Sequence, residues 1–209
     1  KDLGIFLGPL TEIIESFPKI DNGVDRHHIL GLIDTIHDEF GHYCLFADVY
    51  DSIKSDDDPP LNPQELQTWE WDKVLTEMRI KQNHAHGSIG VRASHFTEGG
   101  YCTLFREGMK LEGRGGADDK IAHACREIYE DEFGHMIGGI VGLNDEPLSD
   151  HQFELMTDLV QEQLRARVKM RNEEFSFPLT DERVKEIYNG DINPEPFDFE
   201  KAEAMIDHG

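Results

Sequence analysis

The chain has few cysteines and no long apolar run, and both shortages exclude classes of protein. Among its 209 residues are three cysteines, Cys44, Cys102 and Cys125, without a Cys-x-x-Cys pair. The odd count argues against a disulfide framework or a structural zinc site, and it favours a reducing, cytoplasmic compartment. Because no stretch of eighteen apolar residues occurs, we expect no membrane-spanning helix.

Basic residues are also scarce. The sequence has 20 Lys and Arg against 43 Asp and Glu, a formal net charge of −23. Such an acidic surface repels phosphate backbones, so nucleic acid is not an expected partner. Bound cations would neutralise some of the carboxylates, and most of the others are expected to be solvated.

The sequence lacks the alternating polar and apolar pattern of strands, while apolar residues recur at helical spacing. The prediction is therefore an all-α fold in a single domain of residues 1–209, with a bundle core at about 9–143 and C-terminal helices and a tail at 149–209. The predicted helices cover 9–17, 25–52, 64–86, 89–112, about 118–143 and 149–173, with two short helices in the tail.

The most informative feature is a repeated pentapeptide, Asp-Glu-Phe-Gly-His, at residues 38–42 and 131–135. Each copy places a Glu and a His three positions apart, Glu39 with His42 and Glu132 with His135. On a helix these positions are neighbours on one face, so that a carboxylate and an imidazole can bind one ion together. Two such pairs are typical of a four-helix bundle with two metal ions at its centre.

A third acidic residue falls at the same height. Glu98 lies 17 residues before Gly115 and Glu132 lies 17 residues after it. If the two helices form an antiparallel hairpin, both positions are about 25 Å from the turn. Carboxylates with imidazoles and no thiolate suit iron or manganese, so we expect two iron ions and leave an iron–manganese pair open.

These motifs resemble those of the ferritin-like di-iron carboxylate superfamily. Residues 131–135 are similar to the Asp-Glu-x-Arg-His box of the bacterial multicomponent monooxygenase hydroxylases, with Gly in place of Arg, and residues 96–109 resemble their third ligand helix. The resemblance covers about residues 24–143. It implies a ferritin-like four-helix bundle with additional helices, and Glu39, His42, Glu98, Glu132 and His135 as metal ligands.

The resemblance also implies dioxygen activation, with hydroxylation or N-oxygenation of a small organic substrate and with an electron-donor protein as a partner. The 59 residues between Glu39 and Glu98 leave room for an extra helix that can wall off a substrate pocket. We therefore expect an oxygenase or oxidase. The alternative is an iron-storage, ferroxidase or peroxidase protein, and a homodimer is left open.

The family pattern requires one more carboxylate, on a helix before Asp25. Glu12, Glu15 and Asp2 are available, and Glu12 is the choice made here, with a five-ligand site as the alternative.

Residues close to the predicted ligands are candidates for roles in catalysis or in orienting those ligands. Cys102 and Tyr101 are candidate catalytic residues, because they follow Glu98 by about one helical turn; core packing is the alternative for both. Asp38 and Asp131 are candidates to accept the second ring N–H of a ligand histidine, and His95 is a candidate extra ligand or neighbour of one.

Overall fold

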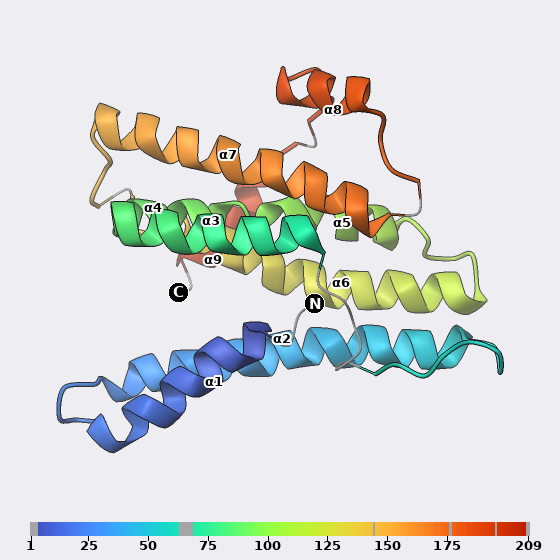
Figure 1. Ribbon diagram of the computed structural model, residues 1–209, viewed down its shortest axis with the longest axis horizontal. Helices are drawn as coiled ribbons and strands as arrows, with labels where there is room; N and C mark the ends of the chain where they lie inside the picture. The colour runs from blue at the N-terminus through green and yellow to red at the C-terminus, as the bar shows by residue number, and fades with distance from the viewer. Residues whose placement is uncertain (1–3, 63–68, 144, 176, 195, 208–209) are drawn as a thin grey trace. The chain divides into compact units, whose positions relative to one another are not determined.

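The computed structural model describes residues 4–62, 69–143, 145–175, 177–194 and 196–207, with residues 4–8 described as backbone only (Figure 1). No β-strand occurs within these ranges, which confirms the all-α prediction. The elements are α1 Gly4–Ser16, the 3-10 helix η1 Phe17–Lys19, α2 Arg26–Ile53, α3 Glu70–His86, α4 Ser88–Phe96, α5 Gly99–Met109, α6 Gly116–Gly138, α7 Asp150–Glu174, α8 Asp181–Tyr188 and α9 Phe199–Asp207.

Local capping explains where the long helices begin. The Asp25 carboxylate accepts a hydrogen bond from the His27 backbone N–H at 2.9 Å and caps α2, at the residue where the predicted helix 25–52 begins. At α7, the Ser149 hydroxyl and the Gln152 side chain form a reciprocal capping box. The predicted helix 64–86 starts in a segment outside the described residues, and α3 begins at Glu70. The predicted helix 89–112 is wrong, because the structure divides it into α4 and α5.

The chain forms two compact units, which we describe separately. The first unit comprises Lys1–Thr68 and Gly108–Ile128, and in it α1 packs along α2 (Figure 1). The second unit comprises Trp69–Glu107 and Tyr129–Gly209. Both the single-domain assignment and the ferritin-like bundle stay predictions.

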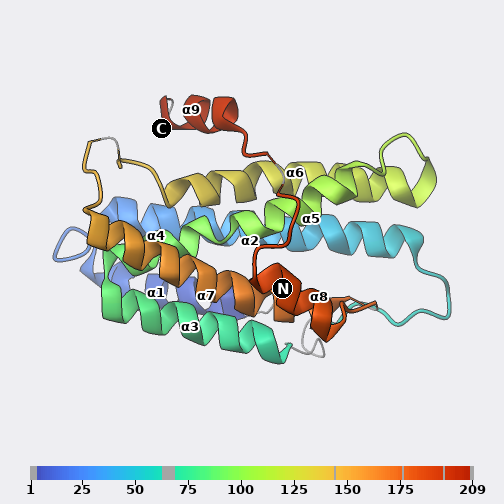
Figure 2. The same ribbon diagram turned by 90° about the horizontal axis from the view of Figure 1, so that it is seen from above.

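The core of the second unit lies among α3, α4 and α7, and α3 runs antiparallel to the other two helices (Figure 2). One buried cluster joins α4 to α7, and another joins α3 to α7. The first contains Ile89, Ala93, Met156 and Leu159, and the second contains Leu75, Ala166 and Met170.

Two expectations about the chain as a whole can be compared with the structure. None of the described helices has the length and apolar character that crossing a membrane requires. Cys44, Cys102 and Cys125 are all free thiols, in agreement with the expected lack of a disulfide framework.

Candidate metal centre

The break between α4 and α5 falls at Thr97 and Glu98, a predicted ligand. The backbone N–H of Glu98 donates to His95 O at 2.9 Å, and that of Gly100 donates to Thr97 O at 3.1 Å. These are bonds across three residues, tighter than the four-residue bonds of an α-helix. A short 3-10-like step therefore sets the direction of the Glu98 side chain.

Close packing explains why two glycines follow the break. A Cβ atom on Gly99 would lie 2.2 Å from the Met136 sulfur, and one on Gly100 would lie 2.6 Å from Cδ of Arg167. Real Cβ atoms do not approach other atoms so closely, so any other residue would require the side chains of Met136 and Arg167, or the helices that carry them, to shift.

Glu98, Glu132 and His135 come together in the second unit. One ligand atom from each lies within 4.8 Å of the other two, and His135 Nδ1 is 3.7 Å from Glu98 Oε2. Glu132 has 1 % of its surface exposed, whereas the side chains of Glu98 and His135 remain 26 % and 30 % exposed. The residues that the hairpin argument placed at one height are therefore neighbours in space.

These three side chains fit a bound metal ion. Two carboxylates and an imidazole are the donors that iron and manganese accept, and the grouping needs only small side-chain movements to surround one ion. Burial of the Glu132 carboxylate costs free energy, which a bound cation would offset.

Arg79 and His95 also approach Glu98. Arg79 Nη1 lies 3.7 Å from Glu98 Oε1, and His95 Nδ1 lies 4.0 Å from Glu98 Oε2. Burial, followed by the charge of Arg167, lowers the pKa of Arg79, while Glu98 and Glu132 oppose this change. The structure thus places His95 beside a predicted ligand, as proposed from its spacing.

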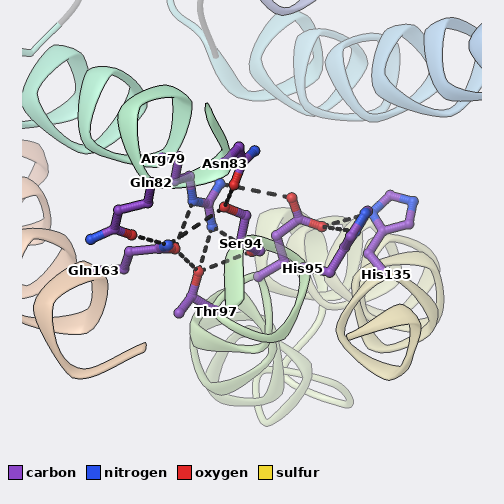
Figure 3. Close-up of polar contacts among 9 residues, drawn as sticks. Arg79, Gln82, Asn83, Ser94, His95, Thr97, His135 and Gln163 are labelled. Carbon is purple, nitrogen blue, oxygen red and sulfur yellow. Dashed lines mark hydrogen bonds and ion pairs between the residues drawn. The ribbon is translucent and has the colours of Figure 1, made fainter. Parts of the chain in front are cut away.

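A buried polar network holds the Thr97 turn in place (Figure 3). Thr97 Oγ1 donates to Gln163 Oε1 at 2.6 Å and accepts from Arg79 Nη2 at 2.8 Å, and Gln163 Nε2 donates to Gln82 Oε1 at 2.7 Å. The sequence argument missed this network. One feature of the sequence could have indicated it: the polar residues Gln163 and Arg167 occur at the helical spacing of the apolar residues of α7. Both are buried in the structure.

The first copy of the motif forms a second pair of candidate ligands in the first unit. Glu39 and His42 lie one turn apart on α2, with 3.8 Å between Glu39 Oε2 and His42 Nδ1. Their side chains are 12 % and 6 % exposed, so a carboxylate and an imidazole are again largely removed from water.

Glu12 is not brought to this pair. Its Oε1 lies 2.7 Å from His28 Nε2, and the Glu12 side chain is 50 % exposed. His28 precedes Glu39 by eleven residues on α2, which is about 16 Å of helix. The choice of Glu12 as a ligand beside Glu39 therefore finds no geometric support.

Asp38 and Asp131, the first residues of the two motifs, are the residues predicted to accept a ring N–H from a ligand histidine. Asp38 Oδ1 lies 3.2 Å from Nδ1 of the adjacent His37, which is not a predicted ligand. Asp131 is exposed on α6, and its role as a partner of a ligand histidine stays a prediction.

Cys102 is buried, with 7 % of its surface exposed, and burial followed by the charge of Glu132 raises its pKa to about 12. It is therefore a neutral thiol and not a ready nucleophile. It lines a pocket of about 110 Å³ together with Gly99, Thr103, Arg106, Tyr129, Phe133, Met136, Pro196, Phe197 and Asp198.

Tyr101 points elsewhere. Its ring stacks with Phe105, with the two ring centroids 6.2 Å apart, and it lies against the guanidinium groups of Arg167 and Arg171 at 4.2 and 4.5 Å. These contacts favour the packing interpretation of Tyr101 over a catalytic one.

Comparison with known proteins adds no identification: no protein-family model, no curated protein and no solved structure matches the chain. The functional argument therefore depends on the residues themselves.

Proposed function

We propose that this protein is a non-haem di-iron oxygenase or oxidase that uses dioxygen to oxidise a small organic molecule. The observation that carries the proposal is the grouping of Glu98, Glu132 and His135, with ligand atoms within 4.8 Å of one another. The same Glu-x-x-His spacing in Glu39 and His42 offers a second set of ligands. An iron–manganese pair fits these donors as well.

In this proposal Glu98, Glu132 and His135 would hold one ion, and Glu39 and His42 would hold the other. Two reduced iron ions, when bound, supply the electrons that activate dioxygen. The chain contributes ligand charge, orientation and protection from water. Thr97 and Arg79 orient Glu98 through the buried network, and Arg79 partly balances the charge of Glu98 before metal binds.

The pocket of about 110 Å³ beside Cys102 is consistent with a small substrate. Its lining is mainly apolar, and it includes Phe133, which directly follows the ligand Glu132. The rings of Phe197 and Phe133 stack with their centroids 6.0 Å apart and form an apolar part of its wall. A thiol that keeps its proton does not compete with the carboxylates for metal, and it can donate a hydrogen bond within the pocket.

Anaerobic titration of the metal-free protein with ferrous iron, followed by rapid mixing with dioxygen, tests the proposal. We expect about two irons per chain, in keeping with the two ligand sets, and a transient change in the visible spectrum after mixing. Less than one iron per chain, or no spectral change on exposure to dioxygen, contradicts the proposal.

Iron storage or ferroxidase activity is the second candidate, because a net charge of −23 favours the entry of cations. The same titration separates the two functions. Continued uptake of many irons per chain together with formation of a large assembly would support storage, whereas saturation at about two supports the oxygenase.

A further inference from the structure

Arg167 on α7 carries a buried charge with an incomplete set of contacts. It has 3 % of its surface exposed, and its Nε, Nη1 and Nη2 atoms form no hydrogen bond with any described residue. Arg171, one turn further along α7, has the same deficit at Nη2. Buried guanidinium groups are normally paired, because removing such a charge from water is costly.

The flat face of the Arg167 guanidinium group packs against an aromatic ring, but its N–H groups form no hydrogen bond with a described residue. Its Cζ atom lies 4.2 Å from the centre of the Tyr101 ring, and that of Arg171 lies 4.5 Å from the same centre. A cation over an aromatic face is stabilised electrostatically, but the N–H groups in the guanidinium plane still lack acceptors. Arg79 adds a positive charge nearby and is paired with Glu98, and Arg171 pairs with Glu174 through Nη1. The Arg167 nitrogens, by contrast, have no hydrogen-bond acceptor among the described residues.

We propose that Arg167, together with Arg171, binds the carboxylate group of an organic substrate. A carboxylate is planar and presents two oxygens, which match the parallel N–H groups of a guanidinium group. This assignment deepens the proposed function and rests on it for the oxidation that follows binding. It defines the substrate class as organic acids.

The position of the arginine pair agrees with this role. Arg167 packs against Gly100, which follows the ligand Glu98 by two residues, so a carboxylate held there is anchored beside the metal ligands. The Arg171 side chain is 15 % exposed, so part of the arginine pair reaches the protein surface. Glu98 and Glu132 nearby disfavour a dianionic phosphate more strongly than a singly charged carboxylate.

Binding to the metal-free protein tests the proposal directly. The probes are acetate and benzoate, with benzamide as the neutral isostere of benzoate and inorganic phosphate as a competing anion, all measured by isothermal titration. We expect both carboxylates to bind and benzamide not to bind. Arg167→Met should weaken carboxylate binding by about tenfold or more, because charge-assisted hydrogen bonds are lost.

Arg165→Met is the matched control. Arg165 lies on the same helix but is exposed, and its guanidinium group lies over the Tyr188 ring at 5.8 Å, so carboxylate binding should stay at the wild-type level. Equal binding by the Arg167→Met protein, no binding of either carboxylate to the wild type, or tighter binding of phosphate each overturns the proposal.

Thermal unfolding without added carboxylate gives a second readout. Methionine removes an uncompensated buried charge and keeps most of the apolar volume, so Arg167→Met should unfold at the wild-type temperature or above it. A marked loss of stability would mean that the chain already satisfies Arg167, and this also overturns the proposal. Iron content, measured separately, tests the proposed function: a protein that binds iron but no carboxylate disproves only the substrate assignment.

Discussion

His135 Nδ1 lies 3.7 Å from Glu98 Oε2, although 37 residues separate the two in the chain. This contact joins the turn after α4 to the second Glu-x-x-His motif on α6. Glu98 also lies near Arg79 and His95, so without metal its charge is balanced by several weak interactions. A metal ion bound to Glu98 and His135 would replace these interactions with direct ligand bonds, and it requires His135 to be neutral.

Glu132→Gln tests the centre at its most buried ligand. The amide keeps the size of the side chain and removes its charge, so metal affinity should fall by about a hundredfold. Removing a residue that only hydrogen-bonds to a metal ligand typically lowers metal affinity by about 10- to 100-fold, and loss of a ligand charge should reach at least the upper end of that range. Ferrous iron should therefore raise the unfolding temperature of the wild type but hardly that of the variant, because binding to the folded state stabilises it by mass action.

Glu127→Gln is the control for this substitution. Glu127 lies on the same helix and is exposed, and its contact is with His123 at 3.8 Å. Its iron response should equal that of the wild type. If Glu132→Gln binds iron as tightly as the control, the assignment of Glu132 as a ligand fails.

Much of the centre follows from the sequence because helices have a constant rise. Glu98 and Glu132 are equally far from Gly115 in the chain, so an antiparallel hairpin places the two side chains at one height. Local chemistry also placed the start of α2 at Asp25 correctly, since a cap needs only its own neighbours in the chain.

The break at Thr97 and Glu98 could not be derived in the same way. Directly after the break, Gly99 and Gly100 pack closely against Met136 and Arg167, which are distant in the chain. Two adjacent glycines weaken a helix, but the sequence does not show which distant side chains pack against Gly99 and Gly100. The choice of Glu12 as a ligand stays a prediction without geometric support, because no pattern of spacing relates α1 to α2 across the irregular turn between them.

Gly100→Ala is expected to destabilise the protein. The added Cβ would lie 2.6 Å from Cδ of Arg167, so the buried Arg167 side chain or one of the two helices must shift, and overpacking of this kind costs about 1–3 kcal/mol. At Gly41, also within a helix, a Cβ meets nothing within 4 Å. Gly41→Ala should therefore raise the free energy of unfolding by about 0.5–1 kcal/mol. Denaturant unfolding measures both, and a Gly100→Ala protein as stable as the wild type would contradict the packing argument.

Gln163→Leu tests the buried network behind Glu98. The substitution removes the oxygen that accepts from Arg79 Nε and from the Thr97 hydroxyl, and Thr97 keeps Ser94 O as its other acceptor. A buried donor left unsatisfied, as Arg79 Nε would be, costs about 1–3 kcal/mol. Gln161→Leu, at an exposed position on the same helix, should change the free energy of unfolding by about 0.5 kcal/mol or less. Equal effects of the two substitutions in urea unfolding would show that the network contributes nothing specific.

Cys102 should give the metal-free protein a stability that declines at alkaline pH. Its pKa is raised to about 12 by burial and by the charge of Glu132, whereas an unfolded thiol titrates near about 8.5. Between these values the folded state binds one more proton than the unfolded state, so the free energy of unfolding falls as the pH rises. The stability that comes from the protonated thiol is fully present below about pH 8.5 and is lost as the pH approaches 12.

Cys102→Ala should flatten this decline in urea unfolding measured from about pH 7 to 10.5. Cys125→Ala should flatten it as well, because burial also raises the pKa of Cys125. An unchanged slope in the double variant would contradict the assignment of a buried, protonated thiol beside Glu132.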